Sequence, residues 1–290
     1  MKNLSEVEIQ EAGIKGFDIN RLTKTLDSDS SVFRQNTPFP YIVLDSFLNE
    51  EIANEALSQF PKVGKQEWIS YLHYNEKKFG LNKYEQLPST IKKLIDELNN
   101  PSFLDYLARL SGIDNLIADP SLEGGGLHLS ERGGFLNIHA DFTVHPHRKT
   151  WERRLNLLIY LNTDWEESYN GKLELWDNKM TECKASLAPI FNRAVIFATN
   201  SDSYHGFPDP IQCPEGMTRK SIALYYYTAA NKEISVRPTN YKARPGDGIK
   251  RVFIYGDKQL INLYTLIKRT FGLNDDFASK ILRLINRKRK

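Results

Sequence analysis

Seven short β-type segments follow one another between positions 126 and 228, and no stretch with helical spacing separates them. They are bounded by Gly, Pro and Asn, which are common in turns. Parallel strands need long crossover connections, so this run predicts antiparallel pairing in a sandwich or barrel, of which a jelly roll is one form. The segments are 126–130, 135–142, 154–162, 171–176, 185–190, 193–199 and 220–228.

Helical patterns flank this β-rich region on both sides. On the N-terminal side a short strand pattern at 38–47 precedes three predicted helices, and on the C-terminal side two more are expected. Residues 1–35 show no clear period and are expected to be a loosely packed leader, whereas 62–87 give no assignable pattern. The predicted helices are 48–60, 88–99 with Ser89 or Thr90 as N-cap, 102–110 ending at Gly112, 257–271 and 276–290.

The fold class is therefore predicted as mainly β, with a jelly-roll core and flanking α-helices. We expect a single domain in three parts: a supporting region at 1–121, the core at 122–230 and a C-terminal helical extension at 231–290. A chain of 290 residues is long enough for this arrangement.

Composition limits the classes of function. The formal net charge of +3 is too small to indicate nucleic-acid binding by itself. Only two cysteines are present, Cys183 and Cys213, which does not suggest a disulfide framework. The start of the chain is polar and acidic, unlike a signal peptide, and the apolar runs are too short to span a bilayer. A cytoplasmic protein is expected.

An H-x-D pair and a distant histidine suggest a metal site inside the β-rich region. His139 and Asp141 stand in N-I-H-A-D-F, and His205 in S-Y-H-G-F. Residues two apart on a strand point to the same face, so His139 and Asp141 can reach one ion. Two imidazoles and a carboxylate on one face of an octahedral ion are typical of non-haem Fe(II) oxygenases. Arg219 follows in T-R-K-S-I-A-L-Y-Y-Y, where a cation can hold the far carboxylate of a dicarboxylate co-substrate.

Structural interpretations remain open for each residue taken alone. An isolated H-x-D recurs by chance, and an arginine in a strand often extends to solvent. His145 and His147 form a competing H-x-H pair, but they flank Pro146 in a turn and are expected to line a substrate entrance instead. His205 and Arg219 would approach each other if segments 193–199 and 220–228 paired as a long hairpin.

Residues from about 124 to 228 resemble the prolyl-4-hydroxylase-like branch of the 2-oxoglutarate/Fe(II)-dependent oxygenases, whose core is a double-stranded β-helix. The opening P-F-P-Y-I-V-L-D-S-F-L is also similar to the N-terminal entry of these enzymes. The matching stretches are G-G-F-L-N-I-H-A-D, then R-L-N-L-L-I-Y-L-N-T-D-W with G-K-L-E-L-W, then A-P-I-F-N-R-A-V-I-F-A-T-N-S-D-S-Y-H-G-F and finally T-R-K-S-I-A-L-Y-Y-Y.

The resemblance implies a role for each matching residue. His139, Asp141 and His205 would bind Fe(II), and Arg219 with Tyr160 would hold the distal carboxylate of 2-oxoglutarate. Strand alternation places Asn156 and Leu158 on the same face as Tyr160, and Ser221 follows Arg219 by two positions, so these residues are expected to line the co-substrate pocket. One departure is clear: where some relatives have a second tyrosine, this chain has His128 or Leu129.

The activity implied is O2-dependent hydroxylation of an unactivated C–H bond, with release of succinate and CO2 and with ascorbate as reductant. A small molecule, a glycan precursor or a protein side chain would be the substrate. The alternative is a jelly-roll protein that binds metal or ligand without turnover. The C-terminal stretch K-I-L-R-L-I-N-R-K-R-K is basic and amphipathic, so it is expected either to pack on the domain or to contact an anionic membrane. The sequence does not define the oligomeric state.

Overall fold

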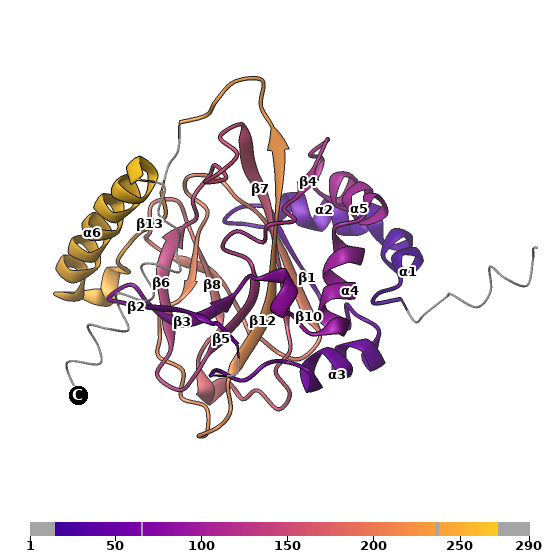
Figure 1. The fold of residues 1–290 in the computed structure, drawn as a ribbon, viewed down its shortest axis with the longest axis horizontal. Coiled ribbons are helices and arrows are strands. Elements are labelled where there is room, and N and C mark those ends of the chain that lie inside the picture. The colour runs from indigo at the N-terminus through magenta and orange to yellow at the C-terminus, as the bar shows by residue number, and fades with distance from the viewer. Residues whose placement is uncertain (1–14, 65, 236–237, 272–290) are drawn as a thin grey trace, which may run out of the picture.

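The computed structural model describes residues 15–64, 66–235 and 238–271, with the side chains of 261–271 excepted. A curved β-sheet forms the centre, five N-terminal helices lie on one side of it, and the C-terminal helix stands on the other (Figure 1). The described helices are α1 (Ile19–Lys24), α2 (Leu26–Gln35), α3 (Glu50–Ser58), α4 (Ser89–Leu98), α5 (Pro101–Ser111) and α6 (Lys250–Phe271).

All pairings in the sheet are antiparallel, and its strands follow the order β1-β10-β7-β12-β5-β3-β6-β11-β8-β9. Three short strands add to this path: β2 on β3, β4 on β12 and β13 on β6. The strands are β1 (Tyr41–Leu44), β2 (Ile69–His73), β3 (Glu76–Leu81), β4 (Ile117–Ala118), β5 (Gly126–Ser130), β6 (Phe135–Ala140), β7 (Trp151–Tyr160), β8 (Leu173–Trp176), β9 (Cys183–Leu187), β10 (Arg193–Ala198), β11 (Tyr204–Phe207), β12 (Arg219–Ala229) and β13 (Asn240–Tyr241).

The sheet folds over on itself, so that its two ends face each other across an inner core. Tyr160 of β7 and Val195 and Phe197 of β10 pack there with Leu173 and Leu175 of β8, although β8 is not a hydrogen-bonded neighbour of either strand. This is the jelly-roll arrangement, and the expected fold class, mainly β with flanking helices, is confirmed.

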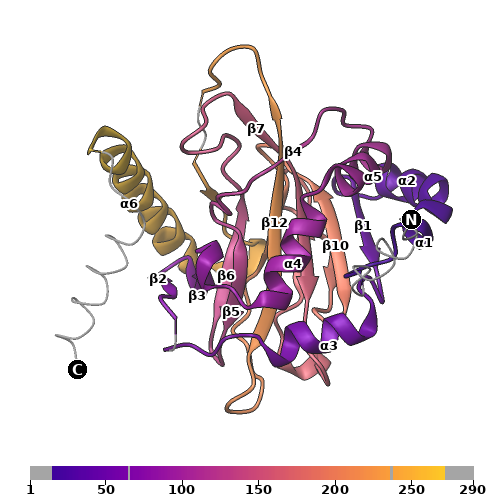
Figure 2. The same ribbon diagram turned by 45° about the vertical axis from the view of Figure 1, so that its right-hand side comes forward.

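The outer face of the same strands packs against the N-terminal helices (Figure 2). Alternate residues of β7, Leu155, Leu157 and Ile159, belong to a core cluster that includes Leu94 of α4 and Phe103 of α5. Each fully buried side chain of this kind contributes about 2 kcal/mol relative to exposure. β7 is therefore buried on both faces, one toward the helices and one toward the interior of the jelly roll.

Local signals explain where α5 begins and ends. The side chain of Asn100 accepts a hydrogen bond from the Phe103 amide, and Pro101 occupies the first turn. Gly112 ends the helix in the left-handed conformation, at φ 73°, as the sequence predicted. The expected cap at Ser89 or Thr90 is wrong: Pro88 is the N-cap of α4, and both residues lie within the helix.

Several expectations outside the core are corrected. Residues 19–35 form α1 and α2, which bury Leu22, Leu26 and Phe33, so this part is not a loosely packed leader. The unassigned region 62–87 contains the β2–β3 hairpin. Helix α6 begins at Lys250 instead of 257, and the helix expected at 276–290 lies outside the described residues.

The proposed hairpin between 193–199 and 220–228 is also wrong. Strand β7 lies between β10 and β12 and pairs with both. His205 instead belongs to a separate strand, β11, which pairs with β6 and β8. Among the described helices, none combines the length and apolar character that crossing a membrane requires.

Candidate metal centre

His139, Asp141 and His205 converge at one point inside the jelly roll. Their candidate ligand atoms all lie within 4.8 Å of one another. The Nε2 atoms of His139 and His205 are each 3.5 Å from the Asp141 carboxylate, the first from Oδ1 and the second from Oδ2. Both histidines are buried. Among the described residues this is the one such group of three, and its donor set fits a ferrous ion.

Each imidazole is oriented by a hydrogen bond to the backbone carbonyl two residues before it. Nδ1 of His139 lies 2.9 Å from the carbonyl oxygen of Asn137, and Nδ1 of His205 lies 2.9 Å from that of Ser203. A carbonyl oxygen only accepts, so each Nδ1 carries the proton and each Nε2 presents a lone pair. Burial lowers the pKa of His205 to about 4, which keeps this imidazole neutral and able to bind a metal.

The pairing of β6 with β11 brings the two histidines together. His205 is the direct partner of His139 in the register, and the two rings lie 4.6 Å apart between centroids. Gly206 permits this approach, because a Cβ there would lie 2.7 Å from the carbonyl oxygen of Leu136. A side chain at 206 would therefore push β11 away from β6.

Asp141 contacts two side chains of β7, an amide and a guanidinium. Asn156 Nδ2 donates to Asp141 Oδ2 at 2.8 Å, and the Arg153 guanidinium lies 3.0 Å from the same oxygen. Arg153 Nε also donates to Asn156 Oδ1 at 2.8 Å, so the three side chains form a closed network. Asn156, predicted to line the co-substrate pocket, is thus bonded to the candidate metal ligand.

Arg153 reaches this position through a β-bulge. The register of β7 against β12 shifts between Leu155 and Arg153, which leaves Arg154 as the extra residue. Arg153 consequently points inward, where its guanidinium carbon lies 3.3 Å from the centroid of the Tyr225 ring. Strict alternation from Asn156 would have placed Arg154 inside instead, so the sequence pattern could not identify Arg153.

The electrostatics of the site favour an ionised aspartate. Burial alone would raise the pKa of Asp141, but the Arg153 cation holds it well below its usual range. The carboxylate is therefore available as an anionic ligand without prior deprotonation.

Arg219 and Tyr160 form a second polar site on the inner face. Arg219 Nε donates to the Gly171 carbonyl at 2.8 Å, and Nη2 donates to the Tyr160 hydroxyl at 3.4 Å. The guanidinium carbon lies 4.2 Å from the centroid of the Phe207 ring. Gly171 has φ 73°, and a Cβ there would lie 3.1 Å from Arg219 Cδ, so glycine suits this contact.

The buried Arg219 cation has no carboxylate partner among the described residues. Tyr160 accepts a hydrogen bond from Arg219, which leaves its own hydroxyl proton free to donate. Burying an unpaired charge is costly, so the Arg219 cation and the adjacent hydroxyl donor would be stabilised by a bound anion. The two side chains therefore fit the distal carboxylate of 2-oxoglutarate.

Of the remaining residues that the sequence suggested for the pocket, some lie beside the polar site and others pack in apolar clusters. Ser221 is buried and is the register partner of Tyr160 on the neighbouring strand, so it lies beside the polar site. Leu158 packs in the apolar cluster of the inner core. His128, which the sequence left as an alternative to Leu129, is the register partner of Ser221, whereas Leu129 belongs to the outer core.

His145 and His147 do not join the candidate metal centre. His145 Nε2 lies 3.4 Å from Asp119 Oδ2, and His147 Nε2 lies 3.8 Å from Glu123 Oε2. These contacts attach the loop after Asp141 to the segment before β5. The competing H-x-H arrangement is therefore part of the scaffold in this structure.

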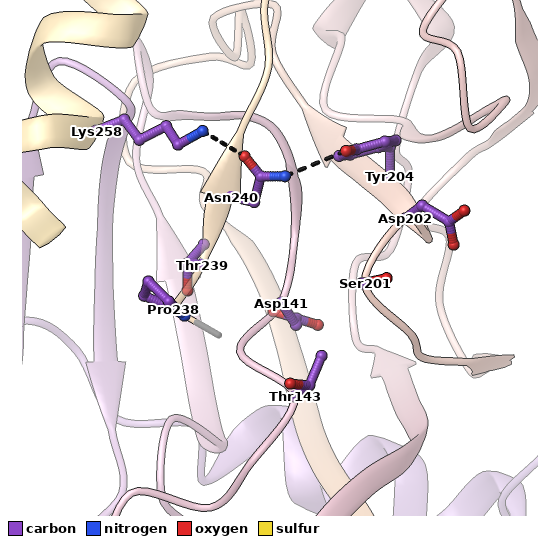
Figure 3. A pocket seen from close by; sticks show the side chains of 9 residues that line it. All are labelled: Asp141, Thr143, Ser201, Asp202, Tyr204, Pro238, Thr239, Asn240 and Lys258. Carbon is purple, nitrogen blue, oxygen red and sulfur yellow. Dashed lines mark hydrogen bonds between the residues drawn. The ribbon is translucent and has the colours of Figure 1, made fainter. Parts of the chain in front are cut away.

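A cavity of about 460 Å³ opens beside Asp141. Figure 3 shows its lining side chains, which come from the loop after β6, the β10–β11 connection with Tyr204, the segment leading into β13, and α6. Of these lining residues, only Asp141 was predicted from the sequence as part of a site. They are Asp141, Thr143, Ser201, Asp202, Tyr204, Pro238, Thr239, Asn240 and Lys258.

Comparison with known proteins agrees with the geometry. Residues 125–227 match the family model of the 2OG-Fe(II) oxygenase superfamily. The mouse protein named prolyl 3-hydroxylase OGFOD1 is 25% identical over 202 residues, which cover 66% of this chain and 35% of the mouse protein. The chain thus matches about a third of the length of that relative.

Solved structures give weaker likenesses. A Trichoplax adhaerens prolyl hydroxylase, solved with a peptide fragment of hypoxia inducible factor, is 18% identical, with a TM-score of 0.49, covering 72% of this chain and 93% of that chain. A Pseudomonas putida prolyl-4-hydroxylase is 15% identical, with a TM-score of 0.43, covering 69% of this chain and 98% of that chain. The family match and the site geometry therefore agree: residues 125–227 are similar to the 2OG-Fe(II) oxygenase superfamily, and the chain is similar to a prolyl hydroxylase.

Proposed function

We propose that this protein is a 2-oxoglutarate- and Fe(II)-dependent dioxygenase that hydroxylates an unactivated C–H bond. One observation carries the proposal: two buried imidazoles and a carboxylate converge on a point in the same interior as a buried, uncompensated arginine. His139, Asp141 and His205 would hold the iron, and Arg219 with Tyr160 would hold the co-substrate. These are the two binding functions that the reaction requires.

When bound, ferrous iron with 2-oxoglutarate and O2 supplies the oxidising chemistry, with release of succinate and CO2. The side chains of the protein bind and orient the reactants. Arg219 neutralises the distal carboxylate, and its planar guanidinium favours a bidentate geometry. Tyr160 donates its free hydroxyl proton to the same group, with Ser221 beside it. Burial of all three excludes water from the carboxylate.

Arg153 and Asn156 act on Asp141 without being candidate ligands. Asn156 donates to Oδ2 and the Arg153 cation pairs with the same oxygen, so the carboxylate cannot rotate freely, and Oδ1 remains directed toward His139. Such partners of a ligand restrict its geometry and tune the metal it binds. The cavity beside Asp141 supplies the place where a substrate C–H bond would approach.

Substrate, reductant and location belong to the same proposal. Prolyl hydroxylases among the relatives support a peptide substrate, whereas the hydroxyl groups and the lysine that line the cavity support a small molecule or glycan precursor. Ascorbate is the proposed reductant. The absence of a disulfide between Cys183 and Cys213 supports the cytoplasm as the location.

Peripheral contact with an anionic membrane through the C-terminal part is a further element of the proposal. The basic stretch 276–290 lies outside the described residues, but α6 before it exposes Val252, Phe253 and Leu260 at helical spacing. An exposed apolar stripe near lysine and arginine is typical of helices at membrane surfaces. Sedimentation with anionic liposomes should fall when 276–290 are removed, and equal sedimentation would contradict the contact.

Succinate formation tests the enzyme activity directly. Purified full-length protein with Fe(II), ascorbate and 2-oxoglutarate should release succinate slowly even without substrate. His139→Ala should remove this activity, while His147→Ala should retain it, because the His147 side chain is 64% exposed and lies away from the triad. Equal succinate from the parent and His139→Ala would refute the proposal. Binding of metal and 2-oxoglutarate without succinate would favour the non-catalytic alternative.

A further inference from the structure

The cavity beside Asp141 is lined at one side by Lys258, and a second lysine, Lys242, lies near it. Lys258 of α6 lines the cavity, and Lys242 follows β13 directly, with its Nζ 5.8 Å from the centroid of the Tyr204 ring. Among the described residues neither ammonium lies within ion-pair distance of a carboxylate. Two neighbouring cations repel each other, so an anion between them would stabilise both.

The Lys258 ammonium is partly withdrawn from water. Burial, and then the neighbouring Lys242, lower its pKa. Its Nζ donates to Asn240 Oδ1 at 2.6 Å, a contact that attaches it to the cavity wall. An ordinary surface lysine extends into solvent, whereas this one is bonded across the side of a cavity that reaches the candidate metal ligand Asp141.

Hydrogen bonds link the Lys258, Asn240 and Tyr204 side chains at the side of the cavity, and they fix the orientation of the Asn240 amide. Lysine can only donate, so the oxygen of the Asn240 amide must face Lys258 and the nitrogen must face Tyr204. Asn240 Nδ2 accordingly donates to the Tyr204 hydroxyl at 3.2 Å (Figure 3). The Tyr204 oxygen is therefore an acceptor in this contact, and its own proton is free to donate to a ligand.

The C-terminal segment holds these groups in position. Strand β13 adds to β6 with Asn240 opposite Ala140 and Tyr241 opposite His139, next to the triad. In α6, Asp257 Oδ2 lies 2.7 Å from His73 Nδ1 and accepts from Asn75 Nδ2, also at 2.7 Å. Since Lys258 is the next residue, this contact to β2 also restricts Lys258.

We propose that the cavity binds a small polar substrate through a carboxylate or phosphate group, which the Lys258 ammonium and the Tyr204 hydroxyl hold next to the metal centre, with the Lys242 cation nearby. The inference rests on the proposed function and adds the chemical class of its substrate. Thr143, Ser201 and Thr239 add hydroxyl groups to the lining, which also includes the carboxylates of Asp141 and Asp202.

Nuclear relaxation with a paramagnetic metal tests this subsite independently of turnover. The full-length protein is loaded with Mn(II) and 2-oxoglutarate, and the relaxation of ³¹P in inorganic phosphate and of ¹³C in carboxyl-labelled acetate is measured. Enhanced relaxation is expected for at least one probe, because the subsite and the metal centre share one cavity. The probe that responds distinguishes a phosphate group from a carboxylate.

Matched variants separate specific from unspecific binding. Lys258→Gln should weaken probe binding about tenfold, since a charge-assisted contact is lost. Tyr204→Phe, which removes one hydroxyl, should weaken it less. Lys24→Gln changes an exposed lysine of α1 on the far side of the sheet and should leave binding unchanged. Equal enhancement in the parent and Lys258→Gln, or none in the parent, would overturn the inference.

Water-proton relaxation in the same samples reports on the metal centre itself. If Mn(II) binds the parent and not His139→Ala, while the probes show no enhancement, the subsite is refuted and the proposed function stands. If Mn(II) binding is the same in both proteins, the proposed function fails, and the substrate class that rests on it fails as well.

Discussion

The Arg153 guanidinium lies 3.0 Å from Oδ2 of Asp141, so a candidate metal ligand is paired with a buried cation inside the jelly roll. The same oxygen accepts from Asn156. Oδ2 therefore contacts both β7 side chains and lies 3.5 Å from His205 Nε2, whereas Oδ1 faces His139. Ligand orientation at this site depends on strand β7 as well as on β6 and β11.

Replacing Arg153 should destabilise the metal-free protein. Arg153→Met leaves the buried Asp141 charge without its cation, a change expected to cost about 3 kcal/mol in free energy of unfolding. Metal affinity should also fall roughly tenfold or more, because the carboxylate loses a positioning partner. Urea denaturation and metal titration measure the two effects.

Arg154→Met is the matched control for this prediction. Its side chain is 37% exposed and forms only a surface contact with Glu152, so the unfolding free energy should change by less than about 0.5 kcal/mol. If the two variants lose equal stability, Arg153 does not carry the electrostatic role assigned to it.

Arg219→Ala should remove 2-oxoglutarate binding almost completely. Loss of a buried partner for a charged group weakens binding by about a hundredfold or more. Arg219→Lys should recover only part of the affinity, since an ammonium cannot form the bidentate contact. Anaerobic calorimetry with the Fe(II) protein measures both. Affinity within a few-fold of the parent in Arg219→Ala would reject this position for the co-substrate.

Gly206→Ala should weaken metal binding without touching a ligand. The added Cβ would lie 2.7 Å from the Leu136 carbonyl oxygen, so β11 must move away from β6 and carry His205 from His139. Gly246→Ala is the control, because a Cβ at that position meets nothing within 4 Å. Fe(II) titration of both variants should show weaker binding only for Gly206→Ala.

Stability should depend on pH through His73. Burial alone would lower its pKa, but hydrogen bonds to Asp257 and Glu76 raise it to about 9 in the folded protein. The folded pKa exceeds the unfolded value of 6.5, so the stabilisation is complete below pH 6.5 and is lost as the pH rises toward 9. The shift corresponds to roughly 3 kcal/mol at most.

Urea denaturation at pH 6, 7.5 and 9 checks this dependence. The difference in unfolding free energy between the parent and His73→Gln should be largest at pH 6 and smallest at pH 9. Asp257→Asn should flatten the same dependence, since it removes one of the two carboxylates beside the imidazole. A difference that grows with pH would contradict the assignment.

Local patterns in the sequence were sufficient to predict the β-sheet core at the centre of the fold. Short β-type segments without helices between them predicted the antiparallel jelly roll, because strand spacing and turn residues act over a few positions. Alternation on a strand likewise predicted that His139 and Asp141 could reach one point. The resemblance to known oxygenases added Tyr160, whose hydroxyl the structure places 3.4 Å from Arg219 Nη2.

Tertiary structure decided what depends on pairing between distant segments. A β-bulge opposite β12 turned Arg153 inward in place of Arg154, and β7 lies between β10 and β12, which were expected to pair as a hairpin. His205 belongs to a separate strand, β11, which pairs with β6. The return of the C-terminal segment onto β6 and β2 placed Lys258 at the cavity. Periodicity records which face a residue occupies along its own strand, but register and strand order are fixed by packing across the whole sheet, so no short stretch of sequence contains them.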